Sequence, residues 1–100
     1  MYVVVYHTIR SQAAFERGLR LQTAEGAPAG ARVVQFLPAV DGSTVVCLWE
    51  SGSVEALQRY VDKMLGETSV NTCYEVAAEP AFARRPLGLA TEPISLRQPV

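Results

Sequence analysis

The stretch Thr44–Tyr60 constrains the fold most, because it joins a fully apolar strand to a capped helix. It reads TVVCLWESGSVEALQRY, and its first part, Thr44–Glu50, is rich in the β-branched and aromatic residues that favour strands. Ser53 is a typical helix N-cap, and apolar residues recur after it at helical spacing. The rest of the chain repeats this pattern, so we expect a single domain that mixes helices and strands.

Three further strands and a second helix are predicted around this stretch. A helix is expected to begin at Ser11, because apolar and small residues after it, Gly18 among them, share one helical stripe. Asp41-Gly42 is a turn signal that joins two strands in a hairpin. The three other predicted strands are Tyr2–Thr8, Ala31–Pro38 and Asn71–Ala78.

The helix after Ser53 has a clear division into two faces. Val54, Leu57, Val61 and Leu65 form the stripe that we expect to be buried. The opposite face is expected to lie in water and carries Gln58, Arg59, Asp62 and Lys63.

The order strand–helix–strand–strand–helix–strand indicates an α+β fold of the ferredoxin-like type. Topology rules favour a βαββαβ split sheet with strand order 4-1-3-2 and both helices on one face. We assign this domain to residues 1–79. Residues 80–100 hold four of the six prolines and are interpreted as a C-terminal arm that lies on its own domain or on a partner subunit.

Two strands are apolar on both faces, which indicates a partner. Val3–Val5 and Val45–Trp49 place apolar side chains on both sides, since successive residues of a strand point in opposite directions. A sheet covered by helices on one face normally alternates apolar and polar residues. A second copy of the chain is the economical cover, so we expect a homodimer.

Charge and hydropathy exclude several classes of partner. A formal charge of −1 offers no basic surface for nucleic acid or for an anionic membrane. The chain has no run of about 20 apolar residues that would span a bilayer. Its first residues lack the basic segment of a signal peptide, and its two cysteines are too few for a disulfide scaffold. We therefore expect a cytoplasmic protein.

The order of the predicted elements, with two strands that are apolar on both faces, resembles the dimeric α+β barrel superfamily. Cys47–Leu57, followed by Tyr74-Glu75-Val76, resembles a small actinobacterial group in that superfamily that includes nickel-binding proteins. The resemblance extends from Tyr2 to about Glu79. It implies a homodimeric α+β barrel. The superfamily includes cofactor-free monooxygenases, cyclases, isomerases, dechlorinating enzymes, haem-degrading proteins and ligand binders. The nickel-binding members carry a histidine in the second helix, where this chain has none and Tyr60 is the nearest polar ring.

His7 is the only histidine and the candidate catalytic residue. It shares a strand face with Val3 and Val5, so it is either a core histidine with one hydrogen bond or an acid/base or orienting group in a pocket. Four aromatic residues on strands are candidates for the walls of a substrate pocket, or else core or interface residues: Tyr6, Phe36, Trp49 and Tyr74.

The cysteines and carboxylates give weaker signals. Cys47 and Cys73 are predicted on strands separated by the first strand, about 9.6 Å apart. This exceeds the roughly 7 Å limit between Cα atoms for a disulfide, so both are expected to be buried and free, with a nucleophilic Cys73 as a minor alternative. His7 with Glu50 or Glu75 is the most that the sequence offers a metal, and no metal site or cofactor is assigned.

Three functions remain open. The first is a homodimer that binds a hydrophobic or aromatic small molecule between sheet and helices. If it is an enzyme, it would be a cofactor-independent monooxygenase, cyclase or isomerase. The second is a nickel or other divalent-metal binder, and the third is a non-catalytic partner-binding or sensor module that uses the arm.

Overall fold

The structure is a computed structural model that describes residues 1–12, 28 and 30–92. Its described elements are four strands, one α-helix and one short 3-10 helix. In chain order they are β1 (Tyr2–Ile9), β2 (Arg32–Pro38), β3 (Thr44–Glu50), α2 (Val54–Leu65), η1 (Gly66–Thr68) and β4 (Ser69–Glu75).

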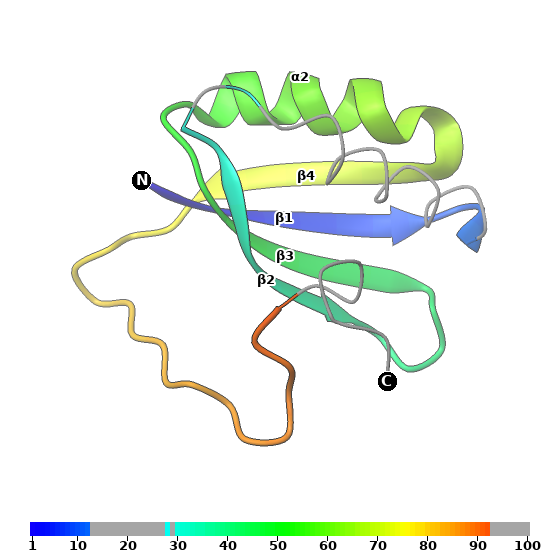
Figure 1. Ribbon diagram of the computed structural model, residues 1–100. Helices are drawn as coiled ribbons and strands as arrows, with labels where there is room; N and C mark the ends of the chain where they lie inside the picture. Colours follow the sequence, from blue (N-terminus) through cyan, green and yellow to red (C-terminus); the bar gives the residue numbers. More distant parts are fainter. Residues whose placement is uncertain (13–27, 29, 93–100) are drawn as a thin grey trace.

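The four strands form one antiparallel sheet in the order β2-β3-β1-β4 (Figure 1). Read from the β4 edge, this is the order 4-1-3-2. The central strands β1 and β3 pair from Tyr2 opposite Glu50 to Thr8 opposite Thr44. A hairpin at Asp41-Gly42 joins β2 to β3, as predicted, and Gly42 has a positive φ of 75°.

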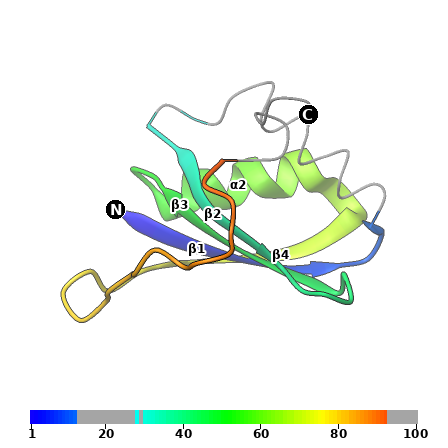
Figure 2. The ribbon, with the colours of Figure 1, turned by 60° about the horizontal axis from the view of Figure 1, so that its bottom comes forward.

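Helix α2 begins and ends at the residues that its sequence indicates. Ser53 Oγ accepts a hydrogen bond from the backbone N–H of Ala56 at 3.1 Å, which satisfies one of the unpaired N–H groups of the first turn. Gly66 follows the last residue with φ of 56°, a conformation that a side chain disfavours. The helix lies along one face of the sheet (Figures 1 and 2).

The core lies between α2 and this inner face of the sheet. Alternate residues of β1 and β3 point into it, together with Leu57, Val61 and Leu65 of α2. The opposite, outer face carries the other residues of each strand, many of them apolar and exposed.

The predicted fold class is wrong. The described residues form four antiparallel strands and a single α-helix of 12 residues, which differs from a two-helix βαββαβ ferredoxin-like fold and from the α+β barrel inferred from it. The first predicted helix falls almost wholly on residues 13–27, outside the described residues. The stripe that predicts this helix contains Gly18, which disfavours a helix by about 1 kcal/mol relative to alanine.

The segment after β4 has neither helix nor strand through residue 92, where the described residues end. It leaves the sheet at Val76, whose N–H donates to Tyr2 O at 2.9 Å. Figure 2 shows its first part passing the sheet on the side away from α2, after which the chain turns up past β2. The boundary at residue 79 stays a prediction.

Candidate functional site

His7 lies in the core between β1 and α2, with 1% of its surface exposed. Its Nδ1 is 2.6 Å from Oδ1 of Asn71, which is the residue opposite it on β4. The ring is therefore held in the core, on the inner face of the sheet.

Asn71 determines which ring nitrogen of His7 carries the proton. Its Nδ2 donates to Asp62 Oδ1 at 3.0 Å, which orients the amide, and its Oδ1 accepts from Ser69 Oγ at 2.6 Å. Because Oδ1 can only accept, the bond to His7 requires a proton on Nδ1. Burial lowers the pKa of His7, while the Asn71 bond raises it to a smaller extent. At neutral pH the ring is uncharged, with its proton on Nδ1 and none on Nε2.

Gln58 links α2 by hydrogen bonds to the free edge of β4. Its Nε2 donates to the backbone oxygen of Asn71 at 2.8 Å, and its Oε1 accepts from the backbone N–H of Cys73 at 3.0 Å. Gln58 Nε2 also donates to Asp62 Oδ2 at 3.1 Å. Asp62 faces water, as predicted, and also bonds Asn71. Gln58 is half-buried instead of facing water, because the exposed edge of β4 offers its side chain backbone partners.

Trp49 occupies the other end of the inner face. Its ring meets the Tyr60 ring edge-on, with centroids 6.3 Å apart and planes at 74°. The indole Nε1 is buried and has no hydrogen-bond partner, the one such side-chain nitrogen or oxygen in the described part of the chain. A buried donor without a partner costs about 1–3 kcal/mol, so this position favours the arrival of an acceptor.

The structure divides the five predicted site residues between two faces. His7, Trp49 and Phe36 are on the inner face, since Phe36 lies opposite the buried Cys47. His7 and Trp49 are at its two ends, because Trp49 lies opposite Val3 and four strand residues span about 13 Å. The two predicted tyrosines, Tyr6 and Tyr74, are on the outer face and exposed. The five do not form one pocket.

A groove of about 490 Å³ lies on the outer face, between the sheet and the segment after β4. It is lined mainly by apolar side chains of β1, β2 and β3 and by alanines and Phe82 of that segment. Sequence reasoning predicted that this face needs a cover. The ligand pocket that it predicted lies between sheet and helices, on the other side of the sheet, and stays a prediction.

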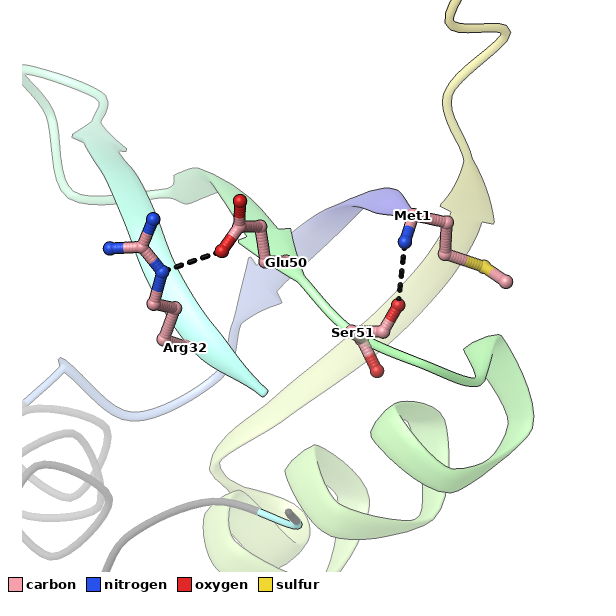
Figure 3. A network of polar contacts seen from close by, with 4 residues as sticks. All are labelled: Met1, Arg32, Glu50 and Ser51. Atoms are coloured by element: carbon pink, nitrogen blue, oxygen red, sulfur yellow. Dashed lines mark hydrogen bonds and ion pairs between the residues drawn. The ribbon is translucent and has the colours of Figure 1, made fainter. Parts of the chain in front are cut away.

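The end of the sheet near Met1 carries an ion pair and the N-terminal ammonium group (Figure 3). Arg32 Nε donates to Glu50 Oε2 at 2.6 Å, and Arg32 holds the pKa of the Glu50 carboxyl below its usual range. The Met1 ammonium donates to Ser51 O at 3.0 Å. Glu50 is thus an ionised group at the rim of the sheet.

Both cysteines are free, as predicted. Burial raises the pKa of Cys47 to about 12. Burial, with a smaller contribution from Asp62, raises the pKa of Cys73 to about 11. Both thiols are protonated near neutral pH, which disfavours a nucleophilic role for Cys73.

The metal ligands considered from the sequence do not converge. His7 is on the inner face and Glu50 on the outer, while Glu75 lies opposite Val3, about 13 Å along β1 from His7. No three His, Cys, Asp or Glu side chains in residues 1–12, 28 and 30–92 are grouped so that they could hold a metal ion.

The comparisons with known proteins concern the family and the fold. A family described as a domain of unknown function, DUF8652, matches residues 2–84. The chain belongs to this family. The crystal structure of SCO4226 from Streptomyces coelicolor A3(2) is similar, with a TM-score of 0.52 and 22% identity over 83% of this chain and 100% of that one. At that identity, the likeness concerns the fold alone. No curated protein matches the chain significantly.

No helix in the described part of the DUF8652 domain is both long and apolar enough to cross a membrane.

Proposed function

We propose that the protein binds a hydrophobic or aromatic small molecule between the inner face of its sheet and the helical side of the domain. The observation that carries this proposal is the buried indole N–H of Trp49, which has no acceptor. A ligand with one oxygen or nitrogen acceptor and an otherwise apolar body would satisfy this donor without disturbing the apolar residues around it.

The surroundings of Trp49 support a neutral ligand. Val33 and Val3 lie opposite it on the neighbouring strands, and Tyr60 contributes a ring edge. No charged side chain is buried among the described residues, so an ionic ligand would lose its hydration without compensation. His7, uncharged and fixed by Asn71, is the candidate orienting or acid/base group if the ligand is also transformed.

We also propose that the protein is a homodimer that acts in the cytoplasm. The outer face of the sheet exposes apolar side chains on β1, β2 and β4, including Tyr2, Tyr6 and Tyr74, and a second sheet is the economical cover for such a face. The cytoplasmic assignment rests on two cysteines that are both free, as in a reducing compartment.

The first experiment is native mass spectrometry of freshly purified protein, which reports subunit number and any retained organic molecule or metal. A dimer with an organic adduct is the expected result. A bound divalent metal without an adduct would favour the metal-binding alternative instead.

A second experiment tests the Trp49 donor with two matched probes. 1-Acetonaphthone carries a carbonyl acceptor and naphthalene does not. The chain has a single tryptophan, so one indole N–H resonance in a ¹H–¹⁵N spectrum reports the site. We expect the ketone to shift this resonance and to bind about tenfold more tightly than naphthalene, which is the value of roughly one good hydrogen bond.

Trp49→Phe should remove the preference for the ketone, whereas Tyr74→Phe on the outer face should preserve it. Equal binding of both probes by the unmodified protein, or no binding of either, would show that the donor serves a buried water or nothing at all.

A non-catalytic partner-binding or sensor module is the second candidate. The observation that favours it is the segment after β4, which is exposed from residue 77 to residue 92 and carries large apolar side chains. This second candidate would be supported if the purified protein retains no ligand and binds a specific protein partner through this segment.

A further inference from the structure

The segment after β4 lies against the outer face of its own sheet. Its first part passes the sheet on the side away from α2 (Figure 2). Ala81, Phe82 and Ala83 line the groove of about 490 Å³ together with residues of β1, β2 and β3. This arm (residues 77–92) therefore covers part of the face that the proposed homodimer would use.

The arm is held on this face by few contacts. All of its residues are exposed, and Phe82 and Leu87 expose 86% and 98% of their surface. Large apolar side chains are normally at least partly covered, so little buried apolar area would be lost if the arm moved away. Because the core lies on the other side of the sheet, the arm can leave the outer face without unfolding the domain.

A second sheet cannot pack on the outer face while the arm is there. Sheets that pack face to face are about 10 Å apart, and the side chains of the two faces fill that distance. The sheet also has little area to spare. Its four strands of seven or eight residues give a flat footprint of about 450 Å², whereas stable interfaces bury about 800 Å² on each partner. The arm and a second copy are thus alternative covers of one face.

A weak contact is enough for the arm to compete with a second copy, because the arm is tethered beside the face. The backbone N–H of Val76 donates to Tyr2 O at 2.9 Å, which fixes the chain to the sheet a few residues before Ala81. A segment on so short a tether has an effective concentration on the order of millimolar at its site. A second copy at micromolar concentration must displace it.

We propose that the arm is an autoinhibitory strap: it occupies the outer face of its own sheet, and the homodimer forms only from chains whose arms have moved off this face. This inference rests on the proposed homodimer. Both arms must leave, so the apparent dissociation constant of the dimer varies with the inverse square of the fraction of open chains. A small change in how firmly the arm is held therefore has a larger effect on dimerisation.

Substitutions in the full chain test the strap by the sign of their effect. Phe82→Ser removes apolar contact with the groove and should make closure about threefold less favourable. In sedimentation velocity, the dimer dissociation constant should then fall by up to about ninefold, because two arms are involved. Leu87→Ser is the matched control in the same arm and should leave the dissociation constant unchanged, because Leu87 is almost fully exposed and lies outside the groove.

Fixing the arm in place should have the opposite effect. Leu37 and Ala83 both line the groove, so a short bifunctional maleimide should link a Leu37→Cys, Ala83→Cys chain within one subunit at low protein concentration. The linked chain should stay monomeric at concentrations where the same chain without the linker dimerises. The native thiols compete little at pH 7, because burial raises the pKa of Cys47 to about 12 and that of Cys73 to about 11. A Lys63→Cys, Ala83→Cys chain is the control that should not link, because Lys63 is exposed on α2, on the other side of the sheet.

The outcomes separate the two proposals. If the unmodified chain and the Phe82→Ser chain are both monomeric at every concentration, the homodimer is overturned and the strap with it. If a dimer forms but Phe82→Ser leaves it unchanged or weakens it, or if the linked chains dimerise as readily as the unlinked ones, the strap alone is overturned.

Discussion

At the scale of single residues, Asn71 connects the core to the edge of the sheet. Its side chain bonds His7, Ser69 and Asp62. Asn71→Ala would leave a buried imidazole N–H and a hydroxyl without their acceptor. Since each unsatisfied buried group costs about 1–3 kcal/mol, we expect the free energy of unfolding in urea to fall by about 3 kcal/mol.

The neighbouring Thr72 is exposed on the other face and provides the control. Thr72→Ala should change the free energy of unfolding by less than about 0.5 kcal/mol. Equal effects of Asn71→Ala and Thr72→Ala would contradict the role assigned to the network.

His7 makes stability depend on pH in a defined direction. Burial lowers its pKa in the folded state below the ordinary value of 6.5. Below pH 6.5 the unfolded chain therefore binds a proton that the folded one does not, so stability is full above this pH and is lost as pH falls below it. Urea unfolding at pH 7.5 and 5.5 should show lower stability at 5.5, and His7→Gln should remove most of the difference. If the His7→Gln protein loses the same stability between pH 7.5 and 5.5, the pH dependence comes from groups other than His7.

At the scale of elements, Gln58 links α2 to β4. The backbone N–H of Cys73 donates to its side chain, so Gln58→Ala should expose that amide to solvent. We expect its hydrogen exchange to become about tenfold faster, which corresponds to the loss of roughly one hydrogen bond. Arg59→Ala, at an exposed position of the same helix, should leave the rate unchanged.

The elements around Thr44–Tyr60 could be predicted from the sequence, because local signals and burial agree there. Strand β3 and helix α2 have the predicted bounds, Ser53 caps the helix, and Gly66 ends it. A segment can be predicted from its sequence when its local structural preference agrees with its tertiary packing.

The candidate site could not be predicted to the same extent. Alternation places Tyr6 and His7 on opposite faces, but which face is covered depends on the register and on where the helical side of the domain lies. The roles of Gln58 and Asp62 arise from the free edge of β4, which only the assembled sheet presents. A polar residue with an edge strand beside it has no distinctive local pattern.

At the scale of the whole molecule, the outer face decides the assembly. Leu48 is half-buried near the centre of that face and lies opposite Val4 and Gln35. Leu48→Lys would place a charge in the proposed interface, where burial without a partner is costly. We expect the protein to become monomeric in sedimentation velocity, with an unchanged far-UV circular dichroism spectrum.

Lys63→Glu, on the exposed side of α2, is the control and should leave the mass unchanged. A Leu48→Lys protein that is still dimeric would move the interface away from the sheet.

The two edges of the sheet are closed to strand addition by different means. On β4, the Gln58 side chain bonds the backbone N–H of Cys73 and the backbone oxygen of Asn71, which an added strand would otherwise pair with. On β2, a β-bulge between Val33 and Gln35 and the missing N–H of Pro38 interrupt the ladder. Edge-to-edge growth into fibrils is therefore blocked at both ends, so concentrated solutions of the folded protein should resist amyloid nucleation even though its strands are rich in valine.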